Sequence, residues 1–148
     1  MKKIIIMAII WVFVVISLGG CTIFQQLRAD AQEANEYAEE FCFALSFDDI
    51  EIAKEYLHPD WISINGNLEN YLEKFENVNG IDFSNGVSIK RRFWEEATGY
   101  HSQYDGSIYR FGITVVVGDK TLNMYFVVVD NNIGYGLYDF GLYSERPD

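Results

Sequence analysis

The sequence is poor in the residue types that most often build metal and nucleophilic sites. Its 148 residues include two cysteines and two histidines, and their positions do not match the spacing of a zinc site. It has no glycine-rich phosphate loop, no G-x-S-x-G motif and no nucleophile with a base nearby in the sequence. These absences disfavour an enzyme and predict neither a metal nor a cofactor.

Basic residues are scarce as well. Lys2 and Lys3 fall within the first twenty residues, so residues 21–148 hold nine basic side chains against 22 acidic ones. A surface with this balance repels nucleic acid and anionic lipid headgroups, because both carry the same sign of charge. Nucleic acid is therefore not an expected partner.

Residues 1–20 have the three parts of an export signal. Lys2 and Lys3 precede an uncharged run from Ile4 to Leu18, and small residues follow it. As a helix this run would span about 22 Å, which is short of the ~30 Å hydrocarbon core of a bilayer. An uncleaved membrane anchor stays open as the alternative, because the apolar stretch lengthens enough to cross if it continues to Phe24.

The motif Leu18-Gly19-Gly20-Cys21 resembles the lipobox of bacterial lipoproteins. The resemblance implies that Cys21 receives a diacylglyceryl group, that residues 1–20 are removed, and that residues 21–148 form one lipid-anchored domain. Two acyl chains suffice for stable anchoring. It also implies an extracytoplasmic location, at the outer membrane if the host has two membranes, because Thr22 replaces the usual retention aspartate.

The other cysteine, Cys42, then has no intrachain partner for a disulfide. It lies between Phe41 and Phe43, far from any basic residue that would activate a thiol. We expect a small buried side chain rather than a reactive one.

The mature chain divides into a helical part and a strand-rich part. Apolar residues at spacings of three and four predict a first helix, and Asp48 with Glu51 predicts the start of a short second one. A third helix is expected between the cap Asn67 and Gly80. The stripe of the first helix comprises Phe24, Leu27, Ala31, Ala34, Ala38, Phe41 and Leu45.

Four later segments are rich in Val, Ile, Tyr and Phe and predict strands over 87–94, 108–117, 122–130 and 133–143. Short turns at Gly118-Asp119 and Asn131-Asn132 predict antiparallel hairpins between the last three. The expected fold class is α+β, with the N-terminal helices packed on a curved antiparallel sheet of about four strands.

This order of elements, with the turn from Tyr56 to Trp61, resembles the NTF2-like (cystatin-like) lipoproteins over residues 24–143. The resemblance implies a sheet curled around the helices into a cone, although cystatin and ferredoxin-like arrangements remain open. Because aromatic residues fall in the turn and strands that would face or rim such a cone, we expect a concavity between helices and sheet that binds a small apolar ligand. The candidate lining is Trp61, Tyr109, Phe111, Tyr125, Tyr135 and Asp139.

Three polar features could take part in function, but each also has a simpler structural interpretation. Asp139 is placed on the strand face of Tyr135 and Leu137, as an exposed strand-end acid or as the cone acid of NTF2-like enzymes. His58 is more plausible as a capping or surface residue than as a general base. The basic run Lys90-Arg91-Arg92 either protects an edge strand or docks an acidic partner.

Asp130 to Gly134 is a turn and not a calcium loop, because the required ligand positions are occupied by Gly134 and Gly141. Three functions follow as hypotheses. The first is a non-catalytic binding or accessory domain that contacts an envelope protein or a small apolar ligand. The others are an immunity-type inhibitor of a basic toxin and an NTF2-like hydratase or isomerase.

Overall fold

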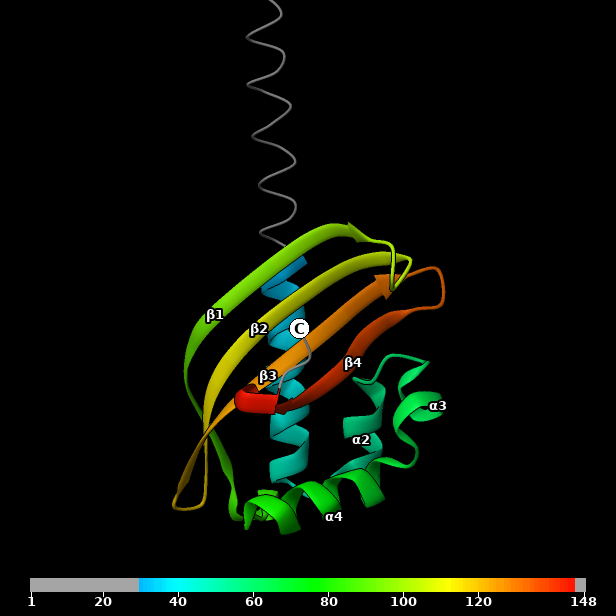
Figure 1. Cartoon of the computed structure of the whole chain (residues 1–148). Coiled ribbons are helices and arrows are strands. Elements are labelled where there is room, and N and C mark those ends of the chain that lie inside the picture. Colours follow the sequence, from blue (N-terminus) through cyan, green and yellow to red (C-terminus); the bar gives the residue numbers. More distant parts are fainter. Residues whose placement is uncertain (1–29, 146–148) are drawn as a thin grey trace, which may run out of the picture.

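The computed structural model describes residues 30–145. The expected signal over residues 1–20, Cys21, and the first-helix positions Phe24 and Leu27 lie outside the described residues. The chain folds as α+β, with N-terminal helices packed against a four-stranded antiparallel sheet that bends around them (Figure 1). The elements are the N-terminal helix (residues 30–46), α2 (Ile50–Glu55), α3 (Trp61–Asn65), α4 (Leu68–Asn79), η1 (Phe83–Asn85), β1 (Val87–His101), β2 (Gly106–Val117), β3 (Lys120–Asn131), β4 (Tyr135–Leu142) and η2 (Tyr143–Glu145).

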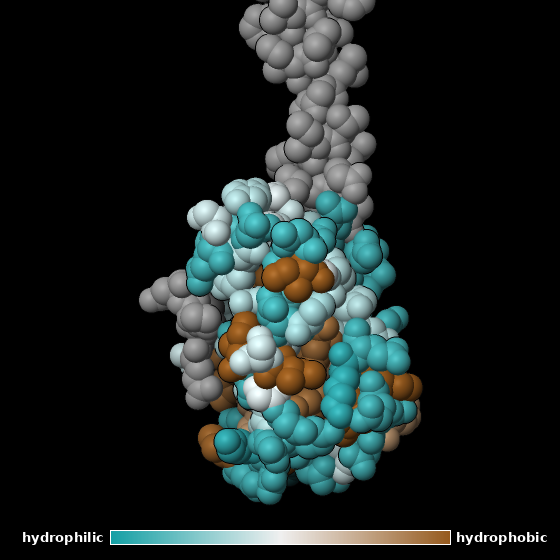
Figure 2. All heavy atoms as spheres, turned by 90° about the vertical axis from the view of Figure 1, so that its right-hand side faces the viewer, coloured by the Kyte–Doolittle hydropathy of each residue, from teal (hydrophilic) through white to brown (hydrophobic). Residues whose placement is uncertain are grey.

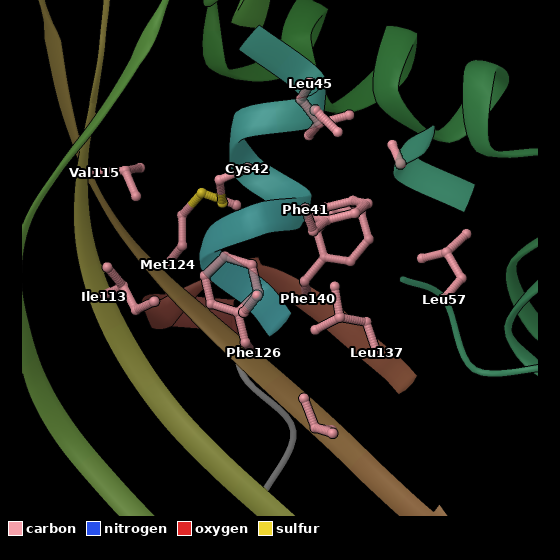
Figure 3. Packing of buried hydrophobic residues seen from close by; sticks show 14 of the residues in the cluster. Phe41, Cys42, Leu45, Leu57, Ile113, Val115, Met124, Phe126, Leu137 and Phe140 are labelled. Atoms are coloured by element: carbon pink, nitrogen blue, oxygen red, sulfur yellow. The ribbon is translucent and has the colours of Figure 1, made fainter. Parts of the chain in front are cut away.

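The described part of the N-terminal helix buries the predicted stripe. Ala31, Ala34, Ala38, Phe41 and Leu45 are all in the core, and the alanines let the helix lie close to the sheet. Between them, Cys42 points toward Met124 of β3 (Figure 3). Cys42 is 1% exposed, which confirms the prediction of a small buried side chain. Burial raises the pKa of its thiol to about 12.

Two further helices begin at side-chain caps. Asn67 accepts a hydrogen bond from the Asn70 amide at the start of α4, and Gly80 ends that helix in the left-handed conformation, as predicted. The cap of α2 is Asp49, which accepts from the Ile52 amide, and not Asp48. Asp48 has a positive φ of 55°, and it forms part of the turn before α2. An N-cap residue normally has an extended backbone, so Asp48 does not have the conformation of a cap.

The short helix α3 was not predicted, and it begins at Trp61, the last residue of the segment expected to be a turn. Its five residues are too few for a helical period to be visible in the sequence. Trp61 opens this helix with its indole fully buried, stacked against Phe140 and edge-on to Tyr71. A helix this short is held by tertiary packing rather than by its own hydrogen bonds.

The strands follow one another in space in the order β1-β2-β3-β4, and all neighbours are antiparallel. β1 continues to His101, past its predicted end at Trp94, because the polar residues after Trp94 still pair with β2. β4 begins later than predicted, at Tyr135. The Asn131 side chain accepts hydrogen bonds from the amides of Ile133 and Gly134 and closes a turn there, as predicted for this segment.

The two sheet faces are both covered, but by different parts of the chain. The inner face packs on the helices through residues such as Ile113, Phe126 and Phe140 (Figure 3). The outer face carries a smaller cluster of Ile108, Tyr125, Val127 and Val129, against which Tyr104, Tyr138 and Tyr143 pack.

The two sheet edges also differ. Tyr56 and His58 exchange backbone hydrogen bonds with Leu137, which covers part of the β4 edge. The β1 edge carries the exposed run Lys90-Arg91-Arg92 and three register shifts. The edge-strand position expected for this run is thus confirmed, and charges with bulges of this kind oppose edge-to-edge pairing.

Candidate functional site

Three of the six predicted lining residues lie in the core. The exposed fractions of Trp61, Tyr109 and Phe111 are 0%, 3% and 1%. All three belong to the cluster between the helices and the inner sheet face. Their side chains therefore contribute to packing, and none of them lines a hollow described below.

Tyr135 lies at the border of the same cluster. Its ring meets that of Tyr37 edge-on, with centroids 5.1 Å apart. Its hydroxyl is buried without a hydrogen-bond partner among the described residues. Burial raises the pKa of the Tyr135 phenol, and the Glu33 carboxylate raises it further.

Tyr125 and Asp139 lie on the opposite face of the sheet. A register shift in β4 leaves Tyr138 unpaired, so Val127 pairs with Asp139 and Val128 with Leu137. The placement of Asp139 on the face of Leu137 was therefore wrong, since a bulge reverses the alternation that the sequence suggests. The six predicted residues do not converge on one concavity.

The Asp139 carboxylate is partly buried and accepts a hydrogen bond of 3.0 Å from the Tyr125 hydroxyl. Burial raises the pKa of Asp139 above its ordinary value, although the hydrogen bonds from Tyr125 and from the Phe140 backbone oppose that rise. A carboxyl in such a place can hold a proton at a higher pH than usual.

A capping or surface position was expected for His58, and the surface alternative was wrong because the side chain is buried. Its Nδ1 accepts a hydrogen bond from the Asp60 amide, and its Nε2 lies 3.1 Å from the Asn131 side-chain oxygen. With Nδ1 as acceptor, Nε2–H donates to Asn131, and the ring joins the segment before α3 to the turn after β3. This arrangement gives His58 a structural role.

A different surface combines open space, apolar side chains and charge. We call it the acidic groove: a hollow of about 310 Å³ between the end of the N-terminal helix and α2. Its lining residues are Glu40, Phe43, Ala44, Phe47, Asp49, Ile52 and Tyr56. The lining includes no lysine or arginine from the described part of the chain.

The local backbone explains why apolar side chains stay exposed there. The N-terminal helix ends at Ser46, and the amides of Phe47 and Asp49 both donate to the Ala44 carbonyl. This tight turn directs Phe47 away from the core, and its exposed fraction is 80%. Across the groove, the Tyr56 hydroxyl donates to Oε2 of Glu40 at 2.9 Å.

A second hollow of about 270 Å³ lies on the other side of the same turn. Its floor includes Leu45, Leu72 and Phe83, and five carboxylates line it, from Asp48, Glu69, Glu73, Glu76 and Asp82. Lys54, the lysine of α2, is paired with Glu51 and Glu69 at 2.7 Å each. The helical end of the molecule is therefore strongly acidic. More broadly, Figure 2 shows apolar patches surrounded by hydrophilic residues on the face that carries α2 and α3.

Sequence reasoning identified the excess of acids but not the groove. The available signal was the pair Phe43 and Phe47, which lies four residues apart and off the buried stripe of the first helix. The excess of acidic residues did not indicate which surface they share, so it could not locate a binding site.

Comparison with protein-family models, with curated proteins and with solved structures finds no match for this chain. Within residues 30–145, no helix is both long and apolar enough to cross a membrane. The same residues contain no cluster of three or more His, Cys, Asp or Glu side chains arranged to hold a metal ion. Function must therefore be inferred from the chain's own residues.

Proposed function

We propose that this chain is a lipoprotein, anchored through Cys21 on the extracytoplasmic side of a membrane, whose α+β domain binds a protein partner without catalysis. The anchor follows from the lipobox-like motif Leu18-Gly19-Gly20-Cys21. In a host with two membranes, Thr22 favours the outer one. The NTF2-like relationship remains part of this proposal.

The observation that carries the binding role is the acidic groove. Phe43, Phe47 and Ile52 are exposed around one hollow, at 45%, 80% and 45%. Contiguous apolar surface with a polar rim is typical of interaction sites. The deep apolar pocket expected from Trp61 and Tyr109 has less support, because both side chains are packed in the core.

An immunity-type inhibitor of a basic toxin is the second candidate. It is favoured by the carboxylates that line both hollows, since an inhibitor of this kind needs acids clustered on an open face. A hydratase or isomerase has weaker support. It would need an acid inside a closed pocket, and Asp139 lies on the sheet face away from the helices, with Tyr125 as its side-chain partner.

Two measurements test the proposal in living cells. Intact mass and membrane fractionation of the wild type and a Cys21→Ala variant test the anchor: we expect the loss of the lipid mass and release from the membrane. A photo-crosslinking amino acid at position 47 tests the binding surface, with position 100 as an exposed control. A discrete adduct from position 47 alone is expected, and its absence would contradict the binding role.

A further inference from the structure

The acidic groove has carboxylates available for a partner of opposite charge. Glu40 and Asp49 form no ion pair with a described residue, unlike Glu51 and Glu69, which hold Lys54. Oε2 of Glu40 accepts a hydrogen bond from the Tyr56 hydroxyl, whereas Oε1 accepts no hydrogen bond from the described residues. The Glu40 carboxylate is thus oriented with one oxygen free for an incoming donor.

The charge of the groove also distinguishes between the kinds of partner that could bind there. Residues 40–56, which span its lining, hold five acidic side chains and one lysine. A second copy of the chain would bring like charges together, and an anionic membrane surface would be repelled. A basic partner gains from the same charges.

We infer that the acidic groove binds a basic amphipathic segment of another protein. An apolar side chain of that segment enters between Phe43, Phe47 and Ile52, while flanking lysines or arginines meet Glu40 and Asp49. The volume of about 310 Å³ is at the lower end for ligand pockets, so side chains enter and the partner's backbone stays outside. This inference rests on the proposed binding function and adds the chemistry of the partner.

The probe is a displayed library of random twelve-residue peptides, selected on the full mature lipoprotein in neutral detergent micelles. Enriched peptides are expected to place Lys or Arg on either side of Leu, Ile or Phe. Binding should fall at least tenfold in Phe47→Ser and severalfold in Glu40→Gln or Asp49→Asn. Asparagine still caps α2, so Asp49→Asn removes the charge and keeps the helix.

Matched controls lie outside the groove. Val78→Ser removes an apolar side chain of similar exposure to Phe47 from α4, and Glu95→Gln removes a charge from β1. Both should bind the selected peptides as the wild type does, and thermal melting of every variant checks that the fold is kept. Raising NaCl from 50 to 500 mM should weaken wild-type binding severalfold.

Three results would overturn the inference. These are enrichment of neutral or acidic peptides, equal losses in Phe47→Ser and Val78→Ser, and a cellular adduct at position 47 with the mass of two copies of this chain. If the peptides fail but position 47 still crosslinks to a different protein, the basic-segment inference fails and the binding function stands. If no adduct forms at position 47, the binding function itself fails.

Discussion

The helical half and the sheet half of this molecule differ in charge. Residues 30–85 carry fourteen acidic and two basic side chains, whereas residues 86–145 carry seven and five. The sheet half supplies most of the large buried side chains, including Phe111, Phe126 and Phe140. The helices complete the core with one face and expose carboxylates on the other. The contrast assigns stability mainly to the sheet and its contacts, and it places the proposed binding surface at the helical end.

The strongest test of this contrast removes the same ring from each region. The Phe140 ring lies 4.9 Å from that of Phe41 and also packs on Trp61 and Tyr71. We expect Phe140→Ala to lower the free energy of unfolding by about 3–5 kcal/mol, through lost burial and a cavity. Phe47→Ala, at an exposed position, should change it by less than about 0.5 kcal/mol. Urea unfolding followed by circular dichroism measures both, and equal losses would abolish the division of roles.

The second prediction concerns the contact that joins the two halves. A Cβ at Gly136 would lie 2.6 Å from the His58 nitrogen and 2.7 Å from the Leu57 carbonyl carbon. Backbone atoms cannot yield easily, so Gly136→Ala should cost about 1–3 kcal/mol. Hydrogen exchange of the His58 and Leu137 amides should also accelerate, because these amides bond across the junction.

Gly66→Ala is the control for the conformational freedom of glycine. Gly66 has a φ of +82°, but a Cβ there meets no atom within 4 Å. Gly66→Ala should lower the free energy of unfolding by about 1 kcal/mol. It should not accelerate hydrogen exchange of the His58 and Leu137 amides. If the two variants exchange alike at these amides, the junction does not depend on close approach at Gly136.

The third prediction uses Asp139, a carboxyl of the sheet half whose pKa is raised. Because burial raises the Asp139 pKa, the folded state holds the proton more tightly than the unfolded state. The contribution of Asp139 to the free energy of unfolding is therefore greatest below about pH 4, the ordinary Asp pKa. It falls as the pH rises from there through the raised pKa of the folded state. Asp139→Asn should remove this fall, an effect below about 1 kcal/mol after solvent screening.

Urea midpoints of the wild type and Asp139→Asn at pH 3.5, 5 and 7 measure the effect. Phe47→Ala is the control from the acidic groove and should leave the pH dependence near the wild type, because it changes no titratable group. A wild type that gains stability relative to Asp139→Asn as pH rises would reverse the assigned sign.

The pattern of the chain predicted the elements better than it predicted the site. The α-helical stripe, the caps of α4 and the four strands could be read because each rests on a local rule about spacing or capping. The side of β4 that carries Asp139 could not, because one bulged residue inverts the alternation after Leu137. Which aromatic residues line a hollow depends on packing across distant segments, so Trp61 was placed in a pocket and lies in the core.

The prediction with the smallest expected effect concerns two tyrosines, each of which donates a hydrogen bond to a carboxylate. Tyr56 donates to Glu40 in the helical half, and Tyr100 donates to Asp105 in the hairpin of β1 and β2, both at 2.9 Å. Each hydrogen bond is the main cause of a raised phenol pKa. Both pairs are exposed, so Glu40→Gln and Asp105→Asn should barely alter the free energy of unfolding.

Each substitution should instead lower the pKa of its own tyrosine toward the ordinary value and leave the other unchanged. Carbon-13 NMR titration of the tyrosine Cζ atoms measures both in one sample, with Tyr56→Phe and Tyr100→Phe assigning the signals. Only the Glu40→Gln variant should also lose affinity for the selected basic peptides, because only Glu40 lies in the acidic groove. If Asp105→Asn weakened peptide binding to the same degree, overall negative charge and not the helical end would account for recognition.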